Sequence, residues 1–110
     1  MIDNPDKTET LLASLEANLP IWARPTQRLA AQLRRHCPGM VVPETFAVVK
    51  LFYSGDDGGI LCTLDFGDPA TKNVPVVSIT HLTFDPTAPL AREIDAYQRH
   101  RIKKLRKLGR

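Results

Sequence analysis

The stretch Asp85–Arg110, DPTAPLAREIDAYQRHRIKKLRKLGR, joins a helix-start pattern to a long two-sided repeat. Asp85 or Thr87 can cap free backbone N–H groups, and the prolines beside them suit a first helical turn, where a missing N–H costs little. Acidic residues come early and basic residues late, which complements the helix dipole. The stretch predicts a helix that runs to about Lys107, with residues 108–110 frayed.

One side of this predicted helix is apolar and the opposite side is basic. At 100° per residue, an apolar stripe runs from Leu90 to Leu108. Gln98 and Arg101 fall on the apolar side, and we expect their stems to lie along it while their polar ends reach water. The apolar stripe would close a small core, so the basic stripe would point outward.

The positive charge of the chain is concentrated at this end. Residues 99–110 hold seven basic and no acidic side chains, so the net charge of +3 averages a basic end and an acidic body. Cations that neutralise phosphates can supply most of a non-specific nucleic-acid affinity. Arginines on a preceding helix would extend the surface if the two helices are neighbours. The candidate phosphate-binding residues are Arg99, Arg101, Lys103, Lys104, Arg106, Lys107 and Arg110.

The preceding residues predict two helices and three strands. A capping box from Asp6 to Glu9 starts the first helix, Pro20 ends it, and we expect Ile21 and Trp22 to pin a linker to the core. Residues after Pro43 are rich in β-branched and aromatic side chains, which favour strands. The predicted elements are helices over 7–18 and 25–36 and strands over 46–53, 60–66 and 74–84.

The three predicted strands differ in pattern. Residues 60–66 alternate apolar and more polar side chains, and a glycine-rich turn at 54–59 predicts an antiparallel hairpin with 46–53. Residues 74–84 place Ser78 and Thr80 among apolar side chains, which suggests a bulge or a second packing surface. We predict one α+β domain over 6–107, ordered α-α-β-β-β-α, with a three-stranded antiparallel meander, helices on one face and a flexible segment over 1–5.

Several classes of protein and site are disfavoured. No apolar run approaches the ~20 residues of a membrane span, and no secretory signal is evident. Two cysteines form no disulfide framework, which favours the cytoplasm and free thiols. His36, Cys37, Cys62 and His81 lack the spacing of a zinc site, so no metal or cofactor is expected.

No catalytic motif is evident either. The Asp56–Asp57 turn lacks the later ligands of a calcium loop and the lysine of a phosphate loop. His81 with Asp65 or Asp85 could form an acid–base pair, but no nucleophile motif accompanies it. The chain is therefore more consistent with a binding protein than with an enzyme.

The predicted order helix-strand-strand-strand-helix over about 25–107 is similar to that of double-stranded RNA-binding domains. The resemblance is in element order alone. Those domains characteristically carry a lysine-rich motif where the last helix starts, and this chain has TAPLAR at 87–92.

Two functions remain as hypotheses. The first is a small non-enzymatic protein that binds another protein or itself through a sheet edge or an exposed apolar patch. The second is a nucleic-acid-binding accessory protein that holds DNA or RNA phosphates on the basic end of the last helix. Such binding should show little sequence preference and weaken steeply with salt.

Overall fold

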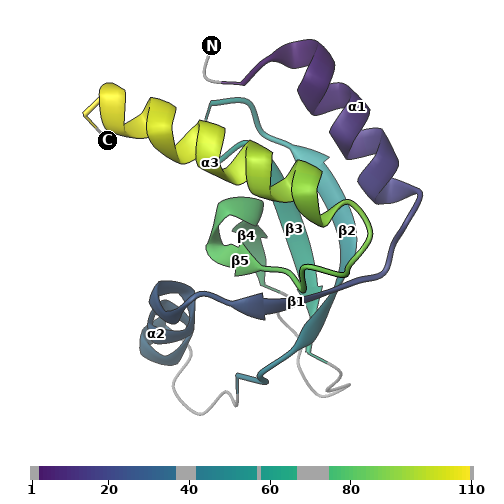
Figure 1. The fold of residues 1–110 in the computed structure, drawn as a ribbon. Coiled ribbons are helices and arrows are strands. Elements are labelled where there is room, and N and C mark those ends of the chain that lie inside the picture. Colours follow the sequence, from purple (N-terminus) through teal and green to yellow (C-terminus); the bar gives the residue numbers. More distant parts are fainter. Residues whose placement is uncertain (1–2, 37–41, 57, 67–74, 110) are drawn as a thin grey trace.

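The computed structural model describes residues 3–36, 42–56, 58–66 and 75–109, which form three α-helices and five strands (Figure 1). This is the mixed α+β class that the sequence predicts. A short 3-10 turn, η1 (Ile79–His81), joins the last two strands. The helices are α1 (Pro5–Glu16), α2 (Gln27–His36) and α3 (Ala91–Lys107), and the strands are β1 (Ile21–Pro25), β2 (Phe46–Tyr53), β3 (Ile60–Asp65), β4 (Val76–Ser78) and β5 (Leu82–Thr83).

The strands form one antiparallel sheet in the order β4-β3-β2-β1-β5. The expected hairpin of β2 and β3 is confirmed, with Leu51 opposite Cys62. Strands β4 and β5 follow each other in sequence, yet β4 pairs with β3 and β5 pairs with β1. Because η1 alone separates these two edge strands, the sheet must curl toward itself (Figure 1).

The predicted three-stranded meander and its element order are wrong, because two strands were not foreseen. Strand β1 lies where the sequence suggested a linker, and its residues alternate between buried and exposed: Ile21 is buried, whereas Trp22 is 65% exposed. The predicted third strand is instead two short strands broken at Ser78, whose hydroxyl accepts a hydrogen bond from the Thr80 N–H. This break explains the irregular polarity of residues 74–84.

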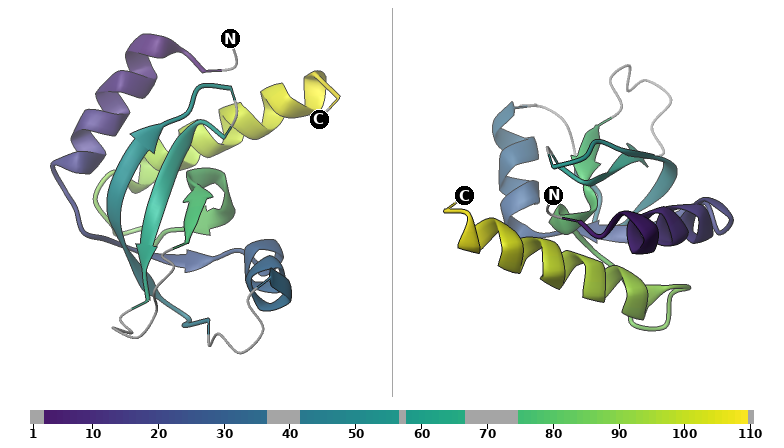
Figure 2. Two further views of the ribbon diagram at one scale, coloured as in Figure 1. Left: turned by 180° about the vertical axis from the view of Figure 1, so that it is seen from behind. Right: turned by 90° about the horizontal axis from the view of Figure 1, so that it is seen from above.

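Helices α1 and α3 cover one face of the sheet, and α2 lies at the far end, beside β1 (Figures 1 and 2). Leu15 of α1, Phe46 of β2 and Ile94 of α3 are each about 1% exposed and belong to one core. The predicted apolar stripe of the last helix does face this core through Ile94 and Tyr97. Farther along α3, Ile102 and Leu108 are exposed, because the helix runs past the sheet.

Residues 3–5 of the predicted flexible segment lead directly into the first helix. Helix α1 begins at Pro5, and the Asn4 side chain, rather than Asp6, caps it by accepting a hydrogen bond from the Lys7 N–H at 3.1 Å. Asp3 is only 3% exposed. Within the described part of the expected flexible segment, residue 3 is therefore a buried structural residue.

The start of α3 also differs from the prediction, whereas its end at Lys107 agrees with it. Leu90 precedes the helix in a left-handed conformation with φ 63° and provides no side-chain cap. Asp85 instead accepts two hydrogen bonds from Thr87, at 2.8 and 2.7 Å, in the turn before the helix. No helix in the described ranges is both long and apolar enough to cross a bilayer.

Candidate functional site

The face of the sheet turned away from α1 and α3 carries exposed apolar side chains on three strands and the partly buried Leu61 on a fourth. We call it the outer sheet face, and no described helix lies over it in the view from behind (Figure 2). Among its larger side chains, Trp22 is 65% exposed, Val76 48% and Phe52 40%. The outer sheet face consists of Trp22, Ala47, Val49, Lys50, Phe52, Leu61, Thr63, Asp65 and Val76.

The strand registers bring these residues into neighbouring rows. Phe52 lies opposite Leu61, and Thr63 lies between Lys50 and Val76. Trp22 lies opposite Ala47, whose small side chain leaves the indole prominent. Cross-strand neighbours of this kind are about 5 Å apart. The rows therefore form one continuous patch rather than scattered apolar residues.

An irregularity in β2 produces part of this patch. The pairing with β3 shifts between Val48 and Lys50, so Val49 is the extra residue of a bulge and is 41% exposed. Strand β2 is apolar on both faces apart from Lys50, and no alternation in the sequence showed which face would be buried. That two-sided apolar character was nevertheless a usable sign of an uncovered surface.

The predicted phosphate-binding residues occupy three different environments. Lys103, Lys104, Arg106 and Lys107 are exposed at the end of α3, and none of them forms an ion pair with another described residue. Arg99 is also exposed, but it pairs with Asp95 at 3.0 Å. Arg110 lies outside the described residues. The remaining residue of the set, Arg101, is buried, so the prediction that it binds phosphate at the surface is corrected below.

Arg101 does not belong to the exposed basic surface, because its side chain is only 2% exposed. Its guanidinium donates to the Asp3 carboxylate at 3.0 Å and to the Asp56 backbone carbonyl at 2.6 Å. The expectation that its charged end reaches water was wrong for this reason. Gln98 behaves similarly, since its amide donates to the carbonyls of Ile79 and Leu82 at 2.7 and 2.8 Å.

The arginines of β1 and α2 do not extend the basic surface of α3, because α2 and α3 lie at different ends of the sheet (Figure 1). Arg24 and Arg34 instead line a shallow open hollow of about 480 Å³, together with Glu44. A carboxylate and two guanidinium groups give this hollow a mixed charge. Pro25, Ala30, Val42 and Pro43 also line it, but the hollow is too open to bury a small ligand.

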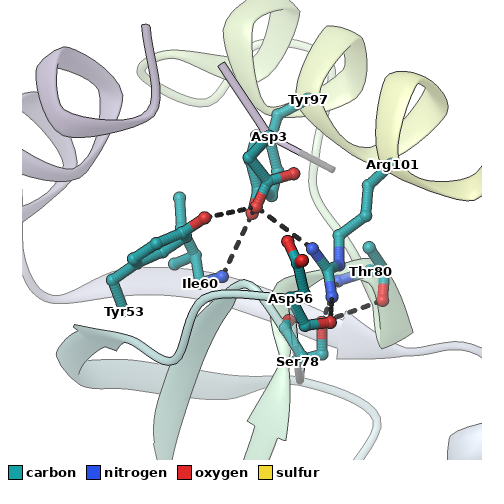
Figure 3. A network of polar contacts seen from close by, with 9 residues as sticks. Asp3, Tyr53, Asp56, Ile60, Ser78, Thr80, Tyr97 and Arg101 are labelled. Atoms are coloured by element: carbon teal, nitrogen blue, oxygen red, sulfur yellow. Dashed lines mark hydrogen bonds and ion pairs between the residues drawn. The ribbon is translucent and has the colours of Figure 1, made fainter. Parts of the chain in front are cut away.

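Asp3, Tyr53, Tyr97 and Arg101 form a buried polar cluster between α3 and the β2–β3 hairpin (Figure 3). One carboxylate oxygen, Asp3 Oδ2, accepts from the Tyr53 hydroxyl at 2.8 Å, the Tyr97 hydroxyl at 2.9 Å and Arg101 Nη1 at 3.0 Å. The other oxygen, Oδ1, is buried and has no hydrogen-bond partner among the described residues. All three hydrogen-bond donors to the Asp3 carboxylate therefore meet on one of its two oxygens.

The two tyrosines of the cluster stay protonated at neutral pH. Burial of its hydroxyl, with the hydrogen bond to Asp3 as the next cause, raises the pKa of Tyr53 to about 12. Burial also raises the pKa of Tyr97, whose oxygen accepts a hydrogen bond from the Ile60 N–H at 3.1 Å. Both hydroxyls therefore act as donors to the carboxylate.

The histidine and cysteine residues do not assemble into a site within the described residues. Cys62 is fully buried in the core, and burial raises the pKa of its thiol to about 12, so it is neither a nucleophile nor an exposed ligand. Burial, followed by the charge of Arg28, lowers the pKa of His81. Cys37 lies outside the described residues. No group of three or more potential metal ligands occurs in the described ranges.

Among the described residues, His81 and Asp85 do not form the ion pair that an acid–base pair would require. The carboxylate of Asp85 is engaged by Thr87, and those hydrogen bonds lower its pKa. The backbone carbonyl of His81 accepts from the Thr26 N–H at 3.1 Å, which ties η1 to the start of α2. The described contact of His81 therefore has a structural role.

No protein-family model, curated protein or solved structure matches the chain.

Proposed function

We propose that the chain is a non-enzymatic protein–protein interaction module that binds a second copy of itself through the outer sheet face. The observation that carries the proposal is a set of exposed apolar side chains on β1, β2 and β4, joined across β3 by the partly buried Leu61, with Trp22 as the most exposed large side chain. Antiparallel sheets commonly expose one face to water, but that face is then usually polar. An apolar face of this kind marks an interaction site.

The dimensions of the outer sheet face suit a small dimer contact. Four strands at about 4.8 Å spacing give a width near 15 Å, and the eight residues of β2 give a length of about 26 Å. The resulting footprint of about 390 Å² is about half of the ~800 Å² that each partner buries in a standard-size interface, so the contact would be a small and weak one.

The chemistry of the face suits a second copy as the occupant. Two sheets that pack face to face interdigitate their side chains at a separation of about 10 Å. Lys50 and Asp65 give the face one charge of each sign, and the exposed Arg24, two residues after Trp22 on the same side of β1, adds a single surplus cation per copy. In a two-fold dimer the same patch serves both partners, and Trp22 would be the central anchor.

Replacing Trp22 with threonine tests the proposal, because threonine keeps the β-strand preference and removes the anchor. We expect the wild-type chain to dimerise in the micromolar range and the Trp22→Thr variant to dimerise at least about 30-fold more weakly, as for loss of an interface hot spot. Sedimentation equilibrium over a range of concentrations measures both constants. Leu108→Gln is the control, since Leu108 is similarly exposed but lies at the end of α3.

Trp22 also reports directly on the contact, because it is the single tryptophan of the chain. Its emission should shift to the red as the protein is diluted and the dimer dissociates. A wild-type chain that remains monomeric at hundreds of micromolar, with unchanged emission, would contradict self-association. Binding to a different protein through the same face would then have to be sought with Trp22→Thr as the non-binding control.

The exposed end of α3 supports a second candidate function, nucleic-acid binding. Lys103, Lys104, Arg106 and Lys107 lie within two helical turns, and the described residues provide no acidic partner for any of them. Since α3 extends beyond the sheet at this end, the cations are accessible to a phosphate backbone (Figure 1). Arg101 does not belong to this surface, because it is buried.

Exchanging two of these lysines for glutamine tests this candidate without disturbing the buried cluster. We expect Lys103→Gln/Lys104→Gln to weaken binding to duplex DNA and RNA and to reduce the slope of log K against log salt by up to about 1.8, for two lost phosphate contacts. Fluorescence polarisation at 50–200 mM salt measures both quantities. Deletion of residues 99–110 would be a poor test, because it also deletes Arg101 and leaves Asp3 without its ion-pair partner.

A matched control removes the same charge elsewhere. Arg34 and Arg35 are exposed at the end of α2, so Arg34→Gln/Arg35→Gln changes the net charge equally at the far end of the sheet. Binding weakened to the same degree by both pairs would indicate a general charge effect rather than a site on α3. Absence of binding by the wild-type chain at low salt would exclude the candidate.

A further inference from the structure

The buried polar cluster has the construction of a binding site for a carboxylate, and Asp3 occupies it in this structure. Three donors from two elements meet one oxygen: Tyr53 from β2, and Tyr97 and Arg101 from α3 (Figure 3). We call the three donor side chains the carboxylate cradle. Arg101 supplies the positive charge and the tyrosines supply neutral donors, which is a set that fits a single negative charge.

Two of the three side chains of the carboxylate cradle, Tyr97 and Arg101, are held in place independently of Asp3. The Ile60 N–H donates to the Tyr97 oxygen at 3.1 Å, which directs the remaining proton of that hydroxyl toward the site. Arg101 is anchored by the Asp56 carbonyl at 2.6 Å, and its helix is packed on the core through Ile94. Donors that are fixed before a ligand arrives bind it without a further ordering cost.

In the described part of its segment, Asp3 is separated from the next buried residue, Thr8, by four exposed residues, Asn4 to Lys7. A short segment with few buried neighbours opens more readily than the whole fold. Its departure would leave the Arg101 guanidinium buried without a counter-charge, which is a strongly unfavourable state.

The Asp3 carboxylate uses only one of its two oxygens in the site, and the site lies close to exposed side chains. Asp3 Oδ1 is buried without a hydrogen-bond partner among the described residues, so the cis-bound carboxylate uses one oxygen only. Tyr53 is 39% exposed and Asp56 is exposed, so one member of the cradle and the residue that anchors Arg101 both reach the surface. The negative charge of Asp56 acts on Tyr53, which disfavours a doubly charged phosphate.

We propose that Tyr53, Tyr97 and Arg101 form a carboxylate-binding site, that Asp3 fills it in cis, and that an external carboxylate replaces Asp3 when that side chain is absent or withdrawn. The ligand class is a monoanionic carboxylate. Its source can be a small acid or an acidic side chain on a polypeptide, since both present the same group. The inference does not depend on self-association or on nucleic-acid binding.

The test uses the full chain with Asp3→Ala, and Asp6→Ala as the matched control on the same segment. Melting temperature is measured at pH 7 in sodium formate, chloride or phosphate at equal ionic strength. We expect formate to raise the melting temperature of Asp3→Ala by at least about 4 °C more than chloride does, with saturation. The wild type and Asp6→Ala should show no such difference, because Asp3 fills their site.

A peptide arm separates the two sources of the carboxylate. A synthetic peptide of residues 1–8 should stabilise Asp3→Ala, whereas the same peptide with Asp3→Asn should not. Stabilisation by formate or by the acidic peptide supports the site, and the stronger of the two identifies the source. Equal effects of formate and chloride with no peptide effect would overturn the proposal, as would stronger stabilisation by phosphate.

A variant that is unfolded in chloride remains informative. The same titration is then followed by circular dichroism, and recovery of the helical signal in formate supports the site. An Asp3→Ala chain that stays unfolded at every formate and peptide concentration overturns the proposal. The further variant Asp3→Ala/Tyr53→Phe should need a several-fold higher formate concentration for half-recovery, because one of the three donors is missing.

Discussion

Replacing Arg101 with methionine should lower the free energy of unfolding by about 3–5 kcal/mol, because it leaves the Asp3 carboxylate buried without its cation. Methionine retains much of the side-chain volume, so the loss is chiefly electrostatic. Such a cost is a large fraction of the 5–15 kcal/mol that holds a typical domain together. Urea denaturation followed by circular dichroism measures it, and a largely unfolded variant agrees with the upper end of the range.

Arg99 provides an internal control on the same helix. Its ion pair with Asp95 has the same 3.0 Å separation as that of Arg101 with Asp3, but its side chain is 81% exposed, compared with 2% for Arg101. Exposed pairs of this spacing contribute about 0.3–0.5 kcal/mol. Arg99→Met should therefore change stability little. Equal effects of the two substitutions would contradict the role given to burial.

The double variant Asp3→Leu/Arg101→Met separates the value of the ion pair from the cost of breaking it. Apolar replacement of both partners of a buried pair is often neutral or stabilising. We expect the double variant to be more stable than Arg101→Met alone, although it also loses the hydrogen bonds from Tyr53 and Tyr97 to Asp3. A double variant that is less stable would show that the cluster stabilises the fold beyond compensating its own charges.

Replacing Gly59 with alanine should also be strongly destabilising, by about 2–5 kcal/mol. Gly59 has φ +68°, a conformation that costs about 1–2 kcal/mol for a residue with a Cβ atom. The added Cβ would also collide with the Tyr97 hydroxyl and lie 3.0 Å from Arg101 Cζ. Neither group can withdraw without losing its hydrogen bonds to Asp3, so overpacking adds about 1–3 kcal/mol.

Gly55 isolates the contribution of the collision. It lies in the same turn with φ +67°, and a Cβ there would have no neighbour within 4 Å. Gly55→Ala should therefore show the backbone cost alone. The difference between the two variants, measured by urea denaturation, reports how rigidly the cluster is held. Indistinguishable stabilities would indicate that Tyr97 and Arg101 move aside easily.

Local pattern was sufficient for some elements and insufficient for others. Strand β3 and helix α3 were predictable because each has a long run of one periodicity, and strand β2 because it is rich in β-branched and aromatic residues. Strand β1 follows Pro20 and ends with Pro25 as its fifth residue, a pattern that is also typical of a linker. Only its pairing with β2 and β5 distinguishes the two possibilities, and pairing partners distant in sequence leave no local trace.

The buried cluster was missed for a related reason. The helical periodicity did place Arg101 on the apolar side of α3, but its long stem also allows the guanidinium to reach water. The partner lies in a segment whose own sequence suggests disorder, and nothing near Asp3 indicates burial. A charged residue on a core-facing stripe is nevertheless a sign that a distant counter-charge exists.

The pairing of Asp3 with Arg101 joins groups 98 positions apart in the chain, which has a consequence during translation. At about 5–20 residues per second, roughly 5–20 s pass between the synthesis of the first partner and that of the second. The nascent protein must keep the aspartate hydrated throughout that interval. Its first helix can dock provisionally, but the native arrangement around the tyrosines has to await the final helix.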